Sequence, residues 1–225
     1  PAASAETSGL RRFFGVFMDA RAYTSLIYML LTLATGVAYF TVVVTGLSLS
    51  VGFAILIIGI PFFLAFIGVT RVIALGEGRL LEAVTGERMP RRPVHPGPSA
   101  SWLTRIGDML KDARTWTTLL YMLLMLPLGI VYFTVAVTVL SVGLAFTVMP
   151  FVSVAQHLGL AANLTLFSDD ARSGAFVLAE HSLLASLLLG IVGVLLLTLL
   201  MHLARGLARA HARLAKTLLV EPGSA

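Results

Sequence analysis

Long apolar runs separated by short charged segments dominate the chain. No Asp, Glu, Lys or Arg occurs between Arg21 and Arg71, or between Arg114 and Asp169. A helix needs about 20 predominantly apolar residues to cross a bilayer, so each run can hold two passes, or one pass and a long apolar loop. Another apolar run follows His181. The pattern predicts four membrane-spanning helices, at about 23–46, 51–73, 116–140 and 182–204.

The apolar pattern is repeated along the chain. Of the 30 positions in 19–48, 19 are identical 93 residues later, in 112–141. A second offset of 134 aligns Arg71 with Arg205 and Arg79 with Arg213, beyond the second and fourth spans. We therefore predict a tandem duplication of a helical hairpin. The first repeat occupies 1–89, a Pro-rich linker 90–100, and the second repeat 101–225.

The two repeats differ in how their spans are connected. The offsets differ by 134 − 93 = 41 residues, so the second repeat carries an insertion. In the first repeat the sequence "GLSLSVG" at 46–52 predicts a tight turn, whereas in the second repeat an extracytoplasmic loop is expected at about 149–181. Each repeat also begins with a short amphipathic segment and ends in a charged extension. The expected fold class is an all-α integral membrane protein with interfacial and juxtamembrane amphipathic helices.

Composition and charge place these helices in a membrane. The chain is 58% hydrophobic and only 12% charged. Cytoplasmic loops are enriched in Lys and Arg, and an arrangement with both termini and 74–115 inside places 15 of the 16 basic residues there. We expect a multi-pass protein of the bacterial inner membrane with both termini cytoplasmic. Both repeats would then cross in the same sense, related by a rotation about an axis near the membrane normal.

Catalytic chemistry finds little support in the sequence. The absence of cysteine excludes disulfides, thiolate metal sites and cysteine nucleophiles. The interiors of the four predicted spans carry no Asp, Glu, Lys or Arg, which argues against an ion-coupled transporter. No phosphate-binding loop, metal-spaced His/Glu cluster or catalytic triad is evident. We therefore expect a non-enzymatic protein without cofactor, metal or nucleic-acid partner, and consider a small transporter a weaker alternative.

Residues repeated within the spans are the first candidates for specific contacts. Small and hydroxylated side chains allow membrane helices to approach and hydrogen-bond, which favours packing between the two repeats; a ligand groove between them is the alternative. The residues of this group are Tyr28, Gly36, Tyr39, Thr41, Thr45, Tyr121, Gly129, Tyr132, Thr134 and Thr138.

A second group of candidates lies in the expected loop and a third in the C-terminal tail. The loop residues could form a metal-binding, proton-sensing or recognition cluster, or be ordinary polar residues. They are His157, Asp169, Asp170, Arg172, Glu180 and His181. The tail carries a basic stripe and a leucine face, which suit anionic lipid and a partner protein respectively. Its residues are Arg205, Leu207, Arg209, Arg213, Leu214, Lys216 and Leu218.

Two segments resemble a known family. The sequences "LLYMLLMLPLGIVYFTVAVTVLS" and "LARGLARAHARLAKTLL" are similar to the sensor domain at the N-terminus of many bacterial, especially actinobacterial, histidine kinases. The resemblance covers 10–220 and implies four spans in two related halves, with a helix leading from the last span toward an output domain. In those kinases a dimerisation helix with a phosphorylatable histidine and an ATP-binding domain follow, whereas no kinase motif surrounds His211.

Two functional hypotheses follow from the resemblance and from this departure. The first is a sensor-type input module that binds partner proteins in the membrane and passes a membrane or periplasmic signal to a separate kinase or regulator. The second is a structural accessory subunit of a larger respiratory or photosynthetic membrane complex. Membrane lipids and other integral membrane proteins are the expected partners in both cases.

Overall fold

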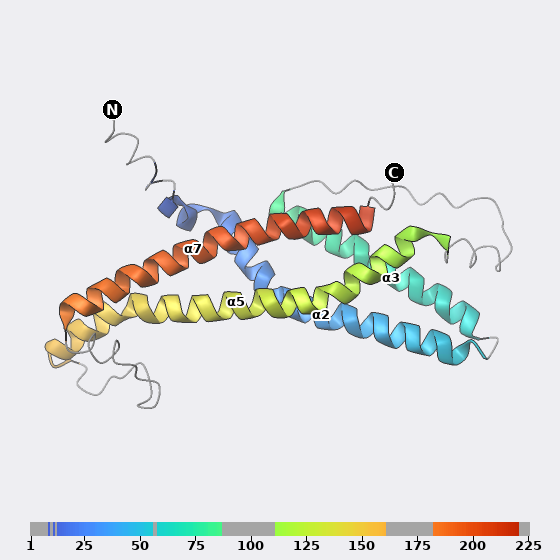
Figure 1. Cartoon of the computed structure of the whole chain (residues 1–225), viewed down its shortest axis with the longest axis horizontal. Helices are drawn as coiled ribbons and strands as arrows, with labels where there is room; N and C mark the ends of the chain where they lie inside the picture. Colours follow the sequence, from blue (N-terminus) through green and yellow to red (C-terminus); the bar gives the residue numbers. More distant parts are fainter. Residues whose placement is uncertain are drawn as a thin grey trace. The chain divides into compact units, whose positions relative to one another are not determined.

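The computed structural model describes residues 9, 11, 13–55, 58–86, 111–160 and 182–220. Within these ranges every regular element is helical (Figure 1). The elements are η1 (Gly15–Met18), α2 (Ala20–Phe53), α3 (Gly59–Thr85), α5 (Ala113–His157) and α7 (Leu183–Ala215), which η3 (Lys216–Val220) continues. Four helices are long and apolar enough to cross a membrane, which confirms the predicted class, an all-α multi-pass membrane protein.

The helices are longer than the predicted spans, and the first turn lies later in the chain. α2 continues through the "GLSLSVG" segment, because the Ser50 hydroxyl donates to the Gly46 carbonyl at 2.6 Å and needs no partner outside the helix. The chain reverses between Phe53 and Gly59, where a Cβ on Gly59 would overlap the Phe53 backbone. α5 likewise runs to His157, so it continues about two turns past Met149, where the loop was expected to begin.

Packing divides the chain into two units that do not follow the repeats. The first unit combines Pro1–Ala22 with Thr134–Ala204, and the second combines Tyr23–Phe133 with Arg205–Ala225. α5 and α7 each contribute to both units. The second unit therefore contains the complete α2–α3 hairpin, the first part of α5 and the tail helix, by which we mean residues 205–220.

Small residues hold the α5–α7 hairpin of the first unit together. A Cβ on Gly193 would lie 2.6 Å from the Thr147 backbone nitrogen, and one on Gly190 would lie 2.6 Å from Pro150. Such contacts allow membrane helices to approach closely. At the other end of this unit, His202 stacks on Phe13 with ring centroids 5.4 Å apart, and its Nε2 lies 3.1 Å from the Phe13 carbonyl oxygen.

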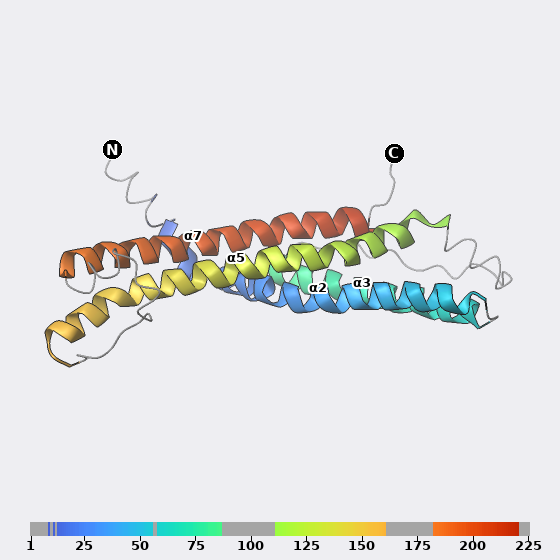
Figure 2. The same ribbon diagram turned by 60° about the horizontal axis from the view of Figure 1, so that its bottom comes forward.

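Within the second unit, α5 runs in the opposite direction to α2. α3 returns antiparallel to α2, with Phe66 against Gly46. An ion pair of 3.5 Å joins Arg71, near the middle of α3, to Asp112 at the start of α5. α5 therefore starts beside α3, and it then crosses α2 while running in the opposite direction, as Figure 1 and Figure 2 show for these segments. The same-sense packing expected of a parallel repeat is not the arrangement found in this unit.

The core of the second unit is made by all four of its helical segments. Its buried side chains form one cluster, with mostly bulky residues from α2, α3 and α5 and mostly small ones from the tail helix. The tail contributes Ala208, Ala212, Ala215 and Leu219. Because alanine side chains are short, the tail backbone lies close to its neighbours, and this closeness brings polar groups of separate helices into contact.

Candidate functional site in a buried Glu-Tyr-His network

Two glycines at equivalent positions of the repeat set the distance between α2 and α5. A Cβ on Gly36 would lie 2.5 Å from the Met125 carbonyl oxygen, and a Cβ on Gly129 would lie 2.5 Å from the Thr32 carbonyl oxygen. These two contacts are equivalent, because 93 residues separate both Gly36 from Gly129 and Thr32 from Met125. The helix crossing therefore has local two-fold symmetry, and no larger residue fits at either glycine without a backbone shift.

Glu77 of α3 is buried beside this crossing and accepts hydrogen bonds from three tyrosines. Its side chain is 1% exposed. Oε1 accepts from the hydroxyl groups of Tyr28 at 2.7 Å and Tyr121 at 3.3 Å, and Oε2 accepts from Tyr39 at 2.7 Å. A buried carboxylate is costly unless it is hydrogen-bonded. The three hydroxyl groups meet that need and join α2, α3 and α5.

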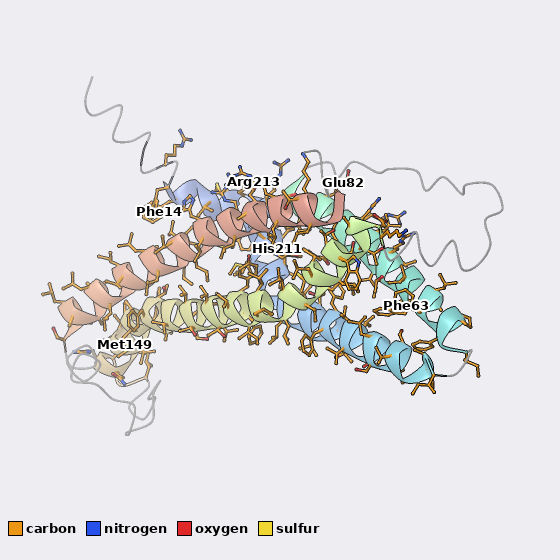
Figure 3. The ribbon with its side chains drawn as sticks, turned by 45° about the vertical axis from the view of Figure 1, so that its right-hand side comes forward. Phe14, Phe63, Glu82, Met149, His211 and Arg213 are labelled. Atoms are coloured by element: carbon orange, nitrogen blue, oxygen red, sulfur yellow. The ribbon has the colours of Figure 1, made fainter. Side chains whose placement is uncertain are left out.

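His211 brings the tail helix into the same network. It is 1% exposed, and its Nε2 lies 3.0 Å from the Tyr121 hydroxyl oxygen. Its ring contacts those of Tyr28, Tyr121 and Tyr132 at centroid distances of 5.6, 5.8 and 5.8 Å. Figure 3 shows His211 and Arg213 on opposite sides of α7. The tail thus directs its histidine toward the other helices of the unit and leaves its arginine outside.

The Tyr121 hydroxyl links the acid to the base. It has one proton, and when it donates that proton to Glu77 it can only accept from His211, so Nε2 carries the imidazole hydrogen and Nδ1 is bare. Nδ1 of His211 is buried and has no hydrogen-bond partner among the described residues. Both carboxylate oxygens of Glu77 therefore have hydrogen-bond partners, whereas one ring nitrogen of His211 has none among the described residues.

The network follows the symmetry of the repeat. Tyr28 corresponds to Tyr121 and Tyr39 to Tyr132 at the offset of 93, and Glu77 corresponds to His211 at the offset of 134. The contact of Glu77 with Tyr28 is thus equivalent to that of His211 with Tyr121. The contact of Glu77 with Tyr121 is likewise equivalent to that of His211 with Tyr28. The hydrogen bond from Tyr39 to Glu77 has an edge-on ring contact, Tyr132 to His211, as its counterpart.

The structure separates the residues that the sequence grouped as packing candidates. The four tyrosines and two glycines lie at the crossing described above. The four threonines lie elsewhere: Thr41, Thr45, Thr134 and Thr138 are exposed on the outer faces of α2 and α5. The Thr41 hydroxyl donates to the Val37 carbonyl of its own helix at 2.8 Å. A threonine satisfied in this way can face lipid, which is why its presence in a span does not identify a helix contact.

The tail residues divide between an exposed and a partly buried set. Arg209, Arg213 and Lys216 are exposed, and Arg205 is half-buried. The three leucines of the predicted apolar face, Leu207, Leu214 and Leu218, are also half-buried, and Leu218 packs against the core of the second unit. The leucine face is therefore partly used within the chain.

Most of the loop candidates lie outside the residues that the structure describes. Asp169, Asp170, Arg172, Glu180 and His181 lie outside the described residues. His157 is the last residue of α5, is exposed, and its Nδ1 lies 2.8 Å from the Ser153 carbonyl oxygen.

Sequence reasoning missed Glu77 as a buried acid. The second span was expected to end near residue 73, which placed Glu77 in a solvated extension and supported the argument that no ionisable residue lies at depth. α3 instead continues to Thr85 and buries Glu77 against α2. The available signal was the offset of 134, which places Glu77 opposite His211 between the matched pairs Arg71/Arg205 and Arg79/Arg213.

The fold and the network define a multi-pass helical membrane protein in which spanning helices and a basic tail helix share one buried polar cluster. The family described as "Putative sensor" matches residues 28–219, which include every residue of that cluster, and the chain belongs to this family. The comparisons with curated proteins and with solved structures gave no match.

Proposed function

We propose that the chain is a non-enzymatic, sensor-type input module that passes a membrane or extracytoplasmic signal to an output partner through its tail helix. Membership of the sensor family supports the sensor-type role. Partner proteins in the membrane would receive the signal by contact with the tail. The exposed residues Arg209, Arg213 and Lys216 are available to such a partner or to anionic lipid.

One observation carries the proposal. The Tyr121 hydroxyl contacts Glu77 of α3 and His211 of the tail helix at the same time. Because His211 and its neighbours Ala208, Ala212 and Ala215 are buried, the tail cannot move away from the spanning helices without breaking this contact. A rearrangement of α2, α3 or α5 therefore changes the position of the tail, as a coupled two-state element requires.

Site-directed cross-linking tests whether the tail contacts an output protein. The chain has no cysteine, so Ala210→Cys introduces a single reactive thiol at an exposed tail position. A photo-activatable thiol reagent attached there in native membranes should yield one defined cross-linked protein, a kinase or another regulator. The matched control is Leu184→Cys, an exposed position at the beginning of the same helix, which should give no such product.

The same experiment distinguishes the sensor-type role from that of an accessory subunit. A cross-link to a stoichiometric subunit of a respiratory or photosynthetic complex, equally strong from both positions, would support a structural subunit and contradict signalling through the tail. Products that contain lipid alone at position 210 would also contradict a protein output at this surface.

We propose that the protein resides in the bacterial inner membrane with both termini cytoplasmic. The distribution of basic residues supports this orientation, since 15 of 16 lie in segments assigned to the cytoplasm. The orientation requires α2 and α5 to cross the membrane in the same sense, whereas they run in opposite directions where they meet in the second unit. The insertion that distinguishes the second repeat, together with His157, then faces the extracytoplasmic side, where loops on a rigid scaffold commonly carry recognition.

A further inference from the structure

The His211 ring is a buried base with one unused nitrogen. Nε2 is in contact with the Tyr121 hydroxyl, whereas Nδ1 is enclosed and has no partner in the part of the chain that the structure describes. Buried polar atoms are almost always satisfied, and one that is not calls for an explanation. When Tyr121 donates its proton to Glu77, Nδ1 carries a bare lone pair, and this is the position at which the network can take up one further proton.

Among the described residues, the groups that face His211 come from three other helices. α2 presents Tyr28, α5 presents Tyr121 and Tyr132, and Glu77 of α3 reaches the histidine through the Tyr121 hydroxyl. On its own helix, the nearest charged residues, Arg209 and Arg213, are exposed. The Glu77 carboxylate favours a positive charge on His211, but its oxygens already accept from three tyrosines. None of these groups is placed to accept a hydrogen bond from Nδ1.

We propose that His211 is a proton-binding site and that its protonation releases the tail helix from the spanning helices. A proton from water would add to the Nδ1 lone pair and give an imidazolium ion, with no bond broken. In the docked tail this ion is buried and its Nδ1–H has no acceptor, which is costly. In a released tail both N–H groups reach water. The proton therefore binds the released state better, and this differential affinity shifts the population toward it.

The sign of the pH dependence follows from this difference. A histidine in water binds its proton near pH 6.5, so protonation leaves docking of the tail unchanged above about pH 6.5 and weakens it progressively as the pH falls below that value. One proton changes the docking equilibrium by at most about tenfold for each pH unit. The inference builds on the proposed function because it names the stimulus of the same tail, but the test below uses purified protein without any partner.

Accessibility of single cysteines measures docking directly. Ala215 is buried on the docked face and Ala210 is exposed on the same helix, so Ala215→Cys reports release and Ala210→Cys corrects for the pH dependence of the thiol reaction. In the full chain in lipid nanodiscs, the ratio of labelling at 215 to labelling at 210 should rise several-fold between pH 8 and pH 5.5. A ratio that is constant, or that falls, would overturn the proposal.

Two variants assign the effect to one histidine. His211→Gln keeps an uncharged hydrogen-bonding side chain and should make the ratio independent of pH. His157→Gln, at the exposed end of α5, is the matched control and should preserve the rise. The same pH-dependent rise in the His211→Gln protein would contradict the proposal, even if the control behaves as expected.

A spectroscopic measurement on the unaltered tail keeps the test valid if His211→Gln fails to dock. In protein labelled with 15N-histidine, the His211 signals are those missing from the His211→Gln spectrum. Their change from neutral imidazole to imidazolium should follow the same midpoint as cysteine exposure. Exposure of position 215 while the His211 nitrogens remain those of a neutral imidazole would exclude His211 as the proton-binding site. A pH response without any cross-linked partner would leave this inference intact and contradict only the proposed output.

Discussion

Glu77 and His211 occupy equivalent positions of the duplicated hairpin and share the hydroxyl group of Tyr121. The duplication has thus placed an acid in one half and a base in the other, at the two centres of a locally symmetric set of tyrosines. The acid is fully hydrogen-bonded and the base is not. Under the proposal above, this asymmetry makes the tail helix, which carries the base, the element that is released.

Replacement of the crossing glycines should destabilise the second unit. Gly36→Ala and Gly129→Ala each place a methyl group 2.5 Å from a backbone carbonyl oxygen, and overpacking of this kind costs roughly 1–3 kcal/mol. Gly76→Ala is the matched control, because nothing lies within 4 Å of its Cβ, and it should be neutral or stabilising by up to about 1 kcal/mol. Unfolding in mixed detergent micelles measures all three. Equal losses would show that α2 and α5 do not cross at these glycines.

Removal of equivalent tyrosine hydroxyl groups should have unequal effects. Tyr39→Phe deletes a 2.7 Å hydrogen bond to Glu77, and bonds to a charged group contribute about 1.5–3 kcal/mol. Tyr132→Phe, the counterpart in the second repeat, removes the hydroxyl group but keeps the ring that packs edge-on against His211. This substitution should therefore cost less than about 0.5 kcal/mol. The free energy of unfolding is again the measurement. A larger loss for Tyr132→Phe would mean that its hydroxyl group satisfies His211.

The ion pair at the start of α5 should matter little for stability. Arg71 and Asp112 approach to 3.5 Å, but each side chain is 41% exposed, and exposed pairs contribute about 0–1 kcal/mol. Asp112→Asn should therefore lower the free energy of unfolding by less than about 1 kcal/mol, and added salt should reduce even that difference. A loss as large as that of Tyr39→Phe would contradict the ranking.

Cysteine labelling from the two sides of sealed vesicles should settle the sense in which α5 crosses the membrane. Ala83→Cys and Lys111→Cys introduce thiols at exposed positions that flank 87–110. That segment carries arginines such as Arg91 and Arg92, each of which costs about 2.5–3.5 kcal/mol at the bilayer centre, so it should remain on one side. We expect both thiols to react with an impermeant reagent from the same side. Reaction from opposite sides would show that the opposite sense of α2 and α5 persists across the bilayer.

The two faces of the tail helix should respond differently to substitution. Leu218 packs against the core of the second unit, so Leu218→Ala should lower the stability of the purified protein by about 1–2 kcal/mol, less than the cost at a fully buried site. Arg213 is exposed, so Arg213→Gln should change stability by less than about 0.5 kcal/mol and instead weaken cross-linking from position 210. If cross-linking is unchanged in Arg213→Gln but lost in Leu218→Ala, the partner contacts the leucine face instead.

The sequence alone was sufficient for the class of protein and for its internal symmetry. Charge-free runs such as the one from Arg21 to Arg71 predict helices that cross a membrane, because a helix satisfies all its backbone hydrogen bonds within lipid. The 93-residue offset identified the pairs Tyr28/Tyr121 and Gly36/Gly129, and family membership agrees with the resemblance on which the sensor-type role was based. These features are local or periodic, and a one-dimensional pattern records them directly.

Only the tertiary structure decided which repeated residues meet and where ionisable groups are buried. The threonines and the tyrosines repeat equally well, yet Thr41 faces outward and Tyr39 bonds Glu77, because a threonine can satisfy its hydroxyl on its own helix and a buried tyrosine hydroxyl cannot. The burial of Glu77 and His211 depends on how far α3 and α7 continue, and on donors from helices distant in the chain. A hydrophobicity pattern predicts that a span ends at the first charged residue. Whether that residue can be buried depends instead on the hydrogen-bond partners that surround it in the folded structure.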